Sequence, residues 1–303
     1  IEVSSLCNLQ CQFCPTTFIK DSDKRNIMSL EDVKKLEPFL KKTHWVYLQG
    51  WGEPLLNSGF WEIVEFCKGT GARVGFTTNG TLLDEEKIAK IIDYKVDLVS
   101  TSIAGATQDT HGQLRTPSQL EKILNNIKLL VNAKTASGNK SPIITLSYML
   151  TTQSIHDLPD AVKIAYELGV DDFYTTNLDY VFSEEANQSK LFSWDGEEID
   201  EYRKLIDLAE EYAVAHDFSF RSYPLKFQEE KGVCDLNPAK MIFITSNGDV
   251  TPCTYLGRFI NPRFFKGQKI DLPRKVFGNI HTEEIEAIWN NPIYRAFRKP
   301  FIV

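Results

Sequence analysis

The sequence lacks the features that mark membrane proteins and nucleic-acid-binding proteins. No apolar run approaches the roughly 20 residues that a helix needs to span a bilayer. Positive charge is not in excess either, since 41 acidic residues against 34 basic ones give a net charge of -7. We therefore expect a globular enzyme or binding protein with neither a membrane nor a nucleic-acid partner.

Cysteine is sparse and unevenly distributed. Six cysteines in 303 residues are too few for the disulfide framework of a small secreted domain. No signal-peptide-like segment opens the sequence, which favours a cytoplasmic location, where reduced thiolates can hold metal. Ile1 is not an initiator methionine, so we expect the sequence to begin inside a longer polypeptide. The five histidines form no H-x3-H grouping, which argues against a separate zinc or iron site.

The first 177 residues show the pattern of βα units around a parallel sheet, in which apolar runs bounded by turn residues alternate with amphipathic stretches. Six strands are predicted, over Ile1–Ser4, Trp45–Gln49, Arg73–Thr77, Leu98–Ile103, Ile143–Met149 and Asp172–Thr176. The intervening helices are predicted over Val33–Leu40, Trp61–Lys68, Lys87–Ile92, Gln119–Ala133 and Asp157–Leu168. The fold class is therefore α/β.

The pattern changes after residue 177. Residues 183–196 are polar and irregular, and Glu197–His216 has the spacing of one long amphipathic helix. Further on, short strands over Met241–Thr245 and Asp249–Thr251 meet at a Ser-Asn-Gly-Asp turn, which predicts a hairpin. A small second domain fits this stretch.

The cysteine triplet Cys7-x3-Cys11-x2-Cys14 carries the strongest chemical signal. Iron-sulfur cubanes are normally bound by four thiolates, so a cluster held by three keeps one iron open for another ligand. The alternatives are a zinc site that lacks one ligand and a chance grouping, but zinc sites usually pair two C-x2-C motifs. The triplet directly follows the first predicted strand, at the strand end where the active sites of barrels gather.

With an aromatic residue before its third cysteine, this motif resembles that of the radical S-adenosylmethionine superfamily. Gln49-Gly-Trp-Gly-Glu-Pro is similar to the family's Gly-Gly-Glu-Pro segment, which grips the amino group of the cofactor, although Trp51 departs from the plain double glycine. Thr77-Thr-Asn-Gly-Thr resembles the family's TNG turn, and a serine and an arginine beyond it resemble residues that hold the cofactor's ribose and carboxylate. The cofactor contacts implied by the resemblance are Phe13, Gly50, Gly52, Glu53, Asn79, Ser102 and Arg115.

The resemblance implies a partial (β/α)6 TIM-like barrel over residues 1–182, a helical bridge over 183–230 and a small α+β domain of SPASM or twitch type over 231–303. It implies a 4Fe-4S cluster on Cys7, Cys11 and Cys14 that reductively cleaves S-adenosylmethionine to a 5′-deoxyadenosyl radical, which abstracts hydrogen from a substrate. A flavodoxin-type or ferredoxin-type reductant is expected. No residue beyond the cluster ligands is assigned a catalytic role.

A second cysteine pair, Cys234 and Cys253, flanks the predicted hairpin, and the Gly248-x4-Cys253 spacing resembles the opening of a SPASM or twitch extension. Such extensions hold auxiliary 4Fe-4S clusters, which need four ligands, and no cysteine follows residue 253. We expect the domain to be incomplete here, with a vestigial pair or two buried thiols as alternatives. Cys67 is expected in the core.

Enzymes with such extensions modify ribosomally made peptides or oxidise small alcohols and sugars. We predict a peptide or protein maturase, with a small-molecule dehydrogenase as the alternative. A non-catalytic iron-sulfur electron-transfer protein is the alternative of another class, and it would not cleave S-adenosylmethionine.

Overall fold

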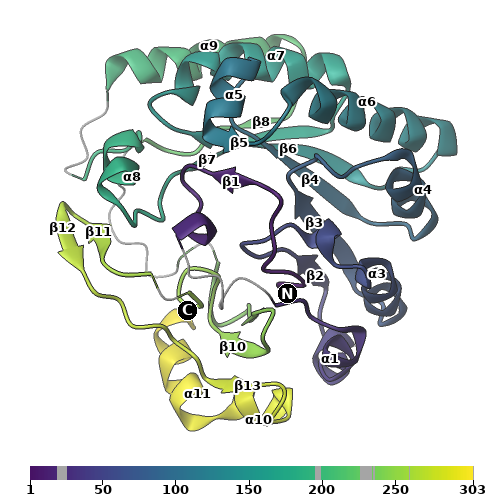
Figure 1. Ribbon diagram of the computed structural model, residues 1–303. Coiled ribbons are helices and arrows are strands. Elements are labelled where there is room, and N and C mark those ends of the chain that lie inside the picture. The colour runs from purple at the N-terminus through teal and green to yellow at the C-terminus, as the bar shows by residue number, and fades with distance from the viewer. Residues whose placement is uncertain (19–25, 195–198, 226–233, 235, 259, 303) are drawn as a thin grey trace.

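The computed structural model describes residues 1–18, 26–194, 199–225, 234, 236–258 and 260–302. At its centre lies a curved sheet of six parallel strands in the order β2-β3-β4-β6-β7-β8 (Figure 1). These strands span Trp45–Leu48, Arg73–Thr78, Leu98–Ile103, Ile143–Leu150, Asp172–Asn177 and Phe220–Arg221. The central strands are buried almost throughout, because helices cover the outer face of the sheet.

The covering helices are α3 (Phe60–Gly69), α4 (Glu85–Asp93), α6 (Leu120–Ser137), α7 (Leu158–Leu168) and α9 (Asp200–Ala215). Local signals fix their ends. Asp84 caps α4 by accepting a hydrogen bond from Lys87 N, and Gly169 ends α7 in the left-handed region at φ 78°. Among the described residues, none of the helices is long and apolar enough to cross a bilayer.

The prediction of a strand over Ile1–Ser4 is wrong. Ser4 makes only an isolated antiparallel bridge to Ile27. Glu2 N donates to Ile244 O at 2.8 Å, and Val3 O accepts from Met28 N at 3.0 Å. The backbone hydrogen bonds of this segment therefore go to several partners and form no ladder, and β8 supplies the sixth strand at the other edge of the sheet.

Two other predictions need correction. The helix expected over Val33–Leu40 is two short helices, α1 (Leu30–Lys34) and α2 (Glu37–Leu40), because Pro38 lacks the N–H that a continuous helix needs. Residues 183–196, expected to be irregular, contain α8 (Glu184–Ser189), which Ser183 caps through Ala186 N. Residues 197 and 198, where the long helix was expected to start, lie outside the described residues.

The hairpin predicted in the C-terminal part is confirmed. Strand β9 (Phe243–Ile244) pairs antiparallel with β10 (Asp249–Thr251), and β13 (Gly278–Asn279) joins the other edge of β10. A second hairpin, β11 (Arg263–Phe265) with β12 (Gln268–Ile270), and helices α10 (Ile285–Asn290) and α11 (Pro292–Arg298) complete this part.

The apolar core runs without a break from the barrel into the C-terminal part. Ile244, Val250 and Ile288 are buried in the same cluster as the barrel strands, and the rings of Phe39 on α2 and Trp289 on α10 lie 5.5 Å apart. The domain limits at residues 182 and 230 stay predictions, and the second lies among residues outside the described ranges.

Candidate functional site

The cysteine triplet lies in a loop over the carboxyl ends of the strands. Its short strand β1 (Gln10–Cys11) pairs antiparallel with β5 (Arg115–Thr116), so that Cys11 faces Arg115 across the ladder. A turn closed by Cys14 N and Cys11 O at 3.1 Å brings the second and third cysteines together. The loop therefore connects the triplet to the segment that follows β4.

The three thiols lie close enough to influence one another. Burial raises the pKa of Cys7 to about 11, and Cys11, Glu53 and Cys14 raise it further. Burial also raises the pKa of Cys11, whereas the positive charge of Arg115 lowers it. Among the described residues, no three His, Cys, Asp or Glu side chains converge as ligands of a single metal ion.

Glu53 and Asn79 join the strand ends to the cysteine loop. The buried carboxylate of Glu53 accepts hydrogen bonds from Leu55 N (3.2 Å), Thr78 Oγ1 (2.8 Å) and Asn79 N (2.8 Å). Asn79 Nδ2 in turn donates to Asn8 Oδ1 at 2.8 Å and lies 4.0 Å from Cys7 Sγ. Asn79 therefore holds the loop that carries Cys7.

Glu53 carries a buried charge for which the described residues offer no ion-pair partner. Its side chain is 2% exposed, and burial raises its pKa to about 7 despite the hydrogen bonds it accepts. A buried carboxylate of this kind is stabilised by an added cation.

Arg115 and Ser102 lie side by side. Arg115 Nη1 donates to the Ser102 carbonyl oxygen at 2.8 Å, which fixes the guanidinium beside the end of β4. His111, one turn before Arg115, is fully buried; it lies 3.3 Å from Ala104 N through Nδ1 and 2.9 Å from Ser118 Oγ through Nε2. The buried ring of His111 therefore ties this loop together.

Phe13 lies beside the triplet and packs against a small apolar cluster. That cluster includes Leu178 and Val181 after β7 and Phe264 of the C-terminal part. Phe13 therefore closes the side of the cysteine loop that faces the second domain.

Gly50 and Gly52 are required by packing against the start of the chain. A Cβ atom at Gly50 would overlap the Glu2 side chain, and one at Gly52 would overlap the backbone of Ser4. This reason was not visible in the sequence, where both glycines were matched only to a cofactor motif.

Glu2 and Trp51 are functional candidates that sequence reasoning missed. Glu2 is fully buried, pairs with Arg258, and accepts from Trp51 N (2.9 Å) and Ser246 Oγ (2.9 Å). The Trp51 indole Nε1 donates to Thr254 O at 3.2 Å. The tryptophan that interrupts the double glycine thus joins the cofactor motif to the C-terminal part.

A cavity of about 1410 Å³ is lined by residues of both the barrel and the C-terminal part. Its walls come from β2, from the segment after β7 and from the C-terminal strands, and they are rich in aromatic rings. Tyr180 stacks on Tyr255 at 5.5 Å, and Tyr255 donates to Asp179 at 3.0 Å. Cys234 and Cys253 both line this cavity, whereas the predicted cofactor contacts do not.

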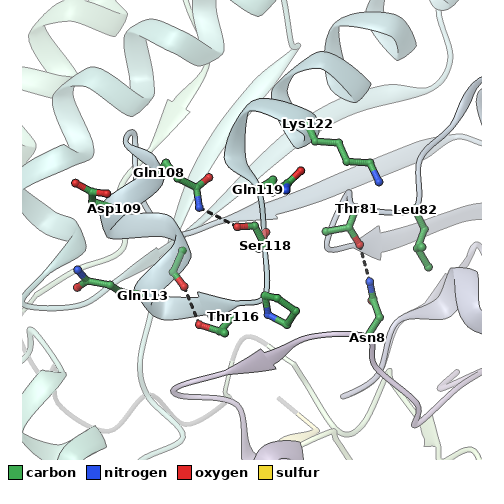
Figure 2. A pocket seen from close by; sticks show the side chains of 12 residues that line it. Asn8, Thr81, Leu82, Gln108, Asp109, Gln113, Thr116, Ser118, Gln119 and Lys122 are labelled. Atoms are coloured by element: carbon green, nitrogen blue, oxygen red, sulfur yellow. Dashed lines mark hydrogen bonds between the residues drawn. The ribbon is translucent and has the colours of Figure 1, made fainter.

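A second, polar pocket of about 800 Å³ lies beside the cysteine loop (Figure 2). Asn8 of that loop points toward Thr81 and donates to its Oγ1 at 2.8 Å. Gln108 on α5 (Gln108–Leu114) donates to Ser118 O at 2.9 Å across the same pocket. These two hydrogen bonds fix the side chains on the two walls of the pocket.

The second cysteine pair comes together at the cavity. Cys253 is buried directly after β10 and Cys234 is exposed. Burial raises the pKa of Cys253, and Cys234 raises it further. Cys67 lies in the core on α3 and is 0% exposed, as predicted.

Comparison with known families decides the assignment. Residues 1–165 match the family model of the Radical SAM superfamily. The chain belongs to the radical SAM superfamily. Residues 234–302 match the SPASM family, described as an iron-sulfur cluster-binding domain. The chain is therefore a radical SAM enzyme, which sets aside the alternative of a non-catalytic electron-transfer protein.

Similar radical SAM proteins differ in what they modify. The chain is 28% identical to the tungsten-containing aldehyde ferredoxin oxidoreductase cofactor-modifying protein of Pyrococcus furiosus, over 98% of this chain and 82% of that protein. It is 26% identical to mycofactocin maturase MftC of Mycolicibacterium smegmatis, over 55% of this chain and 41% of that protein.

Solved radical SAM structures share the fold. SuiB of Streptococcus suis bound to S-adenosylmethionine matches with a TM-score of 0.71 at 18% identity, over 98% of this chain and 66% of that one. The native anSMEcpe structure with bound AdoMet matches with a TM-score of 0.70 at 19% identity, over 99% of this chain and 83% of that one. The chain thus spans about two thirds of SuiB.

The site fits the cofactors of the family, which are a 4Fe-4S cluster and S-adenosylmethionine. Besides burial, neighbouring thiols raise the pKa of both Cys7 and Cys11, so thiolates there need positive charge beside them, which iron supplies. The buried Glu53 carboxylate fits the ammonium of the cofactor, and the Arg115 guanidinium fits a carboxylate. At the second pair, Cys234 and Cys253 both line the cavity, and the described residues of the C-terminal part supply only these two of the four thiolates that a 4Fe-4S cluster normally uses.

Proposed function

We propose that this radical SAM enzyme modifies a peptide or protein substrate held in the cavity between the barrel and the C-terminal domain. In this proposal Cys7, Cys11 and Cys14 hold the cluster. When bound and reduced, the cluster supplies the electron that cleaves S-adenosylmethionine to a hydrogen-abstracting 5′-deoxyadenosyl radical. A reductant of the flavodoxin or ferredoxin type delivers that electron.

The residues of the chain bind and orient the reactants. Glu53 takes the ammonium of S-adenosylmethionine, Arg115 its carboxylate and Ser102 its ribose. Asn79 positions Cys7 through the cysteine loop. Phe13 excludes water from the side that faces the C-terminal domain.

The size and lining of the cavity carry the proposal of a peptide substrate. Its volume of about 1410 Å³ exceeds the roughly 300–1,000 Å³ that is usual for small-molecule pockets. Its walls offer aromatic surface at Tyr180 and Tyr255 and one carboxylate, Asp179, at the carboxyl end of β7. Such a lining suits a side chain together with its flanking backbone.

The first experiment tests radical chemistry. Anaerobically purified, iron-loaded protein is reduced with dithionite in the presence of S-adenosylmethionine, and 5′-deoxyadenosine is measured. Cys14→Ala should abolish the product, while Cys67→Ala, which removes a buried thiol of the core on α3, should retain it. Absence of product from cluster-loaded wild type would refute the proposed chemistry.

A small-molecule substrate is the second candidate. It is supported by the relative aligned over 98% of this chain, whose name describes cofactor modification. Incubation with a short peptide encoded beside the gene discriminates between the two. A peptide mass change that depends on S-adenosylmethionine supports the maturase, and an unmodified peptide with continued 5′-deoxyadenosine formation supports the small-molecule enzyme.

A further inference from the structure

Asp179 places a carboxylate in the cavity that the barrel and the C-terminal part line together. It lies two positions after the end of β7, is exposed, and is the only acidic residue among the described residues of the cavity wall. Tyr255 Oη donates to its two oxygens at 3.0 and 3.3 Å, and no lysine, arginine or histidine of the described residues forms an ion pair with it. A carboxylate can accept about four hydrogen bonds, so Asp179 keeps room for a ligand that donates.

Three lysine or arginine side chains also border the cavity, and none of them neutralises this carboxylate. Arg263 Nη2 is held by two backbone carbonyl oxygens, at 2.6 and 3.2 Å. Lys42 Nζ pairs with Glu286 at 2.7 Å. Lys240 is exposed and makes no ion pair within the described part of the chain. The negative charge of Asp179 is therefore left for a ligand.

Aromatic rings gather beside this carboxylate. Tyr180 stacks on Tyr255 with ring centres 5.5 Å apart, and the Trp51 ring lies 5.0 Å from the first and 6.2 Å from the second. The faces of tyrosine and tryptophan rings attract cations within roughly 6 Å. The Arg263 guanidinium already lies 4.4 Å from the centre of the Tyr180 ring. A carboxylate beside several aromatic rings is suited to a positively charged nitrogen.

Asn177 adds a hydrogen-bond acceptor to the same wall. Its Nδ2 donates to Pro224 O at 2.9 Å, whereas its Oδ1 is buried and has no hydrogen-bond partner. Asn177 and Asp179 both line the cavity, on either side of Leu178. Ammonium and guanidinium groups bring several donors at once, whereas an ionised carboxylate brings only acceptors. The chemistry of this wall therefore favours a cationic ligand over an anionic one.

The segment after β7 and its aromatic neighbours also contact the cysteine loop. Leu178 belongs to the apolar cluster against which Phe13 packs. Thr16 Oγ1 lies 3.3 Å from Cys14 Sγ and donates to Trp51 O at 3.0 Å. This wall of the cavity and the loop that carries the triplet are therefore neighbours.

From this arrangement we infer that the substrate carries an ammonium or guanidinium group, which binds Asp179 beside the Tyr180–Tyr255 stack and so orients the substrate for hydrogen abstraction. Tyr255 is a positioning residue, because its hydroxyl holds the carboxylate. The inference rests on the proposed role of the cavity as the substrate site and deepens it by naming the chemical class of the substrate. A lysine or arginine side chain of a peptide and a small amine offer the same chemistry, and the test separates them.

A matched pair of probes tests the recognition of charge. The probes are two blocked tripeptides that differ only in their central residue, which is lysine in one and norleucine in the other. Isothermal titration of cluster-loaded, unreduced protein with S-adenosylmethionine present measures both affinities. The lysine peptide should bind wild type at least about tenfold more tightly. Asp179→Asn retains an acceptor for Tyr255 and loses the charge, so it should bind the two peptides equally.

Asp160→Asn is the matched control. Asp160 is an exposed aspartate on α7 that pairs with Lys163 at 2.9 Å and does not line the cavity. Its variant should keep the wild-type preference for the lysine peptide. Tyr255→Phe retains the stacked ring and the charge of Asp179 but releases the carboxylate, so its preference should lie between those of wild type and Asp179→Asn.

Equal affinities of wild type for the two peptides, or no binding of either, would overturn the inference. A lysine preference that survives in Asp179→Asn would overturn it as well. Where wild type prefers lysine, pentylamine identifies the source of the nitrogen: an affinity close to that of the lysine peptide indicates a small amine, and a much weaker one indicates a peptide. Formation of 5′-deoxyadenosine by wild type, measured separately, distinguishes a failure of this inference from a failure of the radical chemistry.

Discussion

At the scale of single residues, Glu53 and His111 show how burial prepares the site. Both are buried titratable side chains with their hydrogen bonds satisfied inside the protein. They differ in charge: Glu53 fits a cationic ligand as a carboxylate, whereas the His111 ring is neutral. Each makes a separate prediction.

Glu53→Gln should weaken the binding of S-adenosylmethionine at least about tenfold, or about 1.4 kcal/mol, because the ligand ammonium loses its buried counter-charge. Isothermal titration of cluster-loaded protein measures the affinity. Glu65→Gln, at an exposed position on α3, should bind normally. Equal affinity in Glu53→Gln and wild type would show that Glu53 only supports the loop.

Protonation of His111 should oppose folding in acid. Burial, followed by Arg115, lowers the pKa of this residue to about 3, while in the unfolded chain it stays near 6.5. As the pH falls, the unfolded state therefore binds the proton first. The stability that is present above about pH 6.5 is lost progressively as the pH falls towards 3. Near pH 4.5–5 the loss in the free energy of unfolding should reach about 2 kcal/mol.

Urea unfolding of wild type and His111→Gln between pH 7.5 and 4.5 tests this effect. The stability advantage of wild type should shrink as the pH falls. His44→Gln, at an exposed histidine, should differ from wild type by the same amount at every pH. A constant difference for His111→Gln would show that the buried ring accepts its proton as readily as the unfolded chain does.

At the scale of elements, short turns determine how the C-terminal hairpins form. Gly248 closes the β9–β10 turn at φ 85°, and a Cβ atom there would overlap the His281 ring. Gly267 closes the β11–β12 turn at φ 73° with open space around it. The two glycines share the backbone requirement and differ in packing.

Gly248→Ala should therefore destabilise the protein more than Gly267→Ala does. The backbone strain common to both is about 1 kcal/mol, and the overlap with His281 adds to it only at Gly248. Denaturant unfolding of the two variants side by side gives the difference. Equal losses would mean that His281 moves away without cost.

At the scale of the whole molecule, one buried ion pair joins the start of the chain to the C-terminal domain. Arg258 is 9% exposed and Glu2 is 0% exposed, so neither charge can turn to water when its partner is lost. The pair Lys42–Glu286 also bridges barrel and C-terminal domain, at 2.7 Å, but both side chains are at least half exposed.

Arg258→Met should cost about 3–5 kcal/mol of stability, because it leaves Glu2 buried and unpaired. Lys42→Met removes an exposed pair and should cost less than about 1 kcal/mol. Adding Glu2→Gln to Arg258→Met should recover part of the loss. Denaturant unfolding and limited proteolysis measure both effects. Similar losses of stability in the two single variants would contradict the role of the buried Arg258–Glu2 pair in joining the two parts.

The sequence alone determined the features that are encoded within a few residues. The spacing of Cys7, Cys11 and Cys14, five of the six predicted strands and the β9–β10 turn could all be predicted, because ligand spacing, strand periodicity and turn geometry are local. The strand at residues 1–4 failed for the opposite reason, since its hydrogen bonds go to distant segments.

Only the tertiary structure decided the contacts between distant segments. Glu2 meets Arg258 across 256 positions and Trp51 meets Thr254 across 203, and no local pattern marks either pair. The buried, unsatisfied donors of Arg263 and Tyr294 were equally hidden, because an arginine or tyrosine in the sequence gives no sign of whether its donor will find an acceptor. Burial decides that, and burial depends on how the whole chain packs.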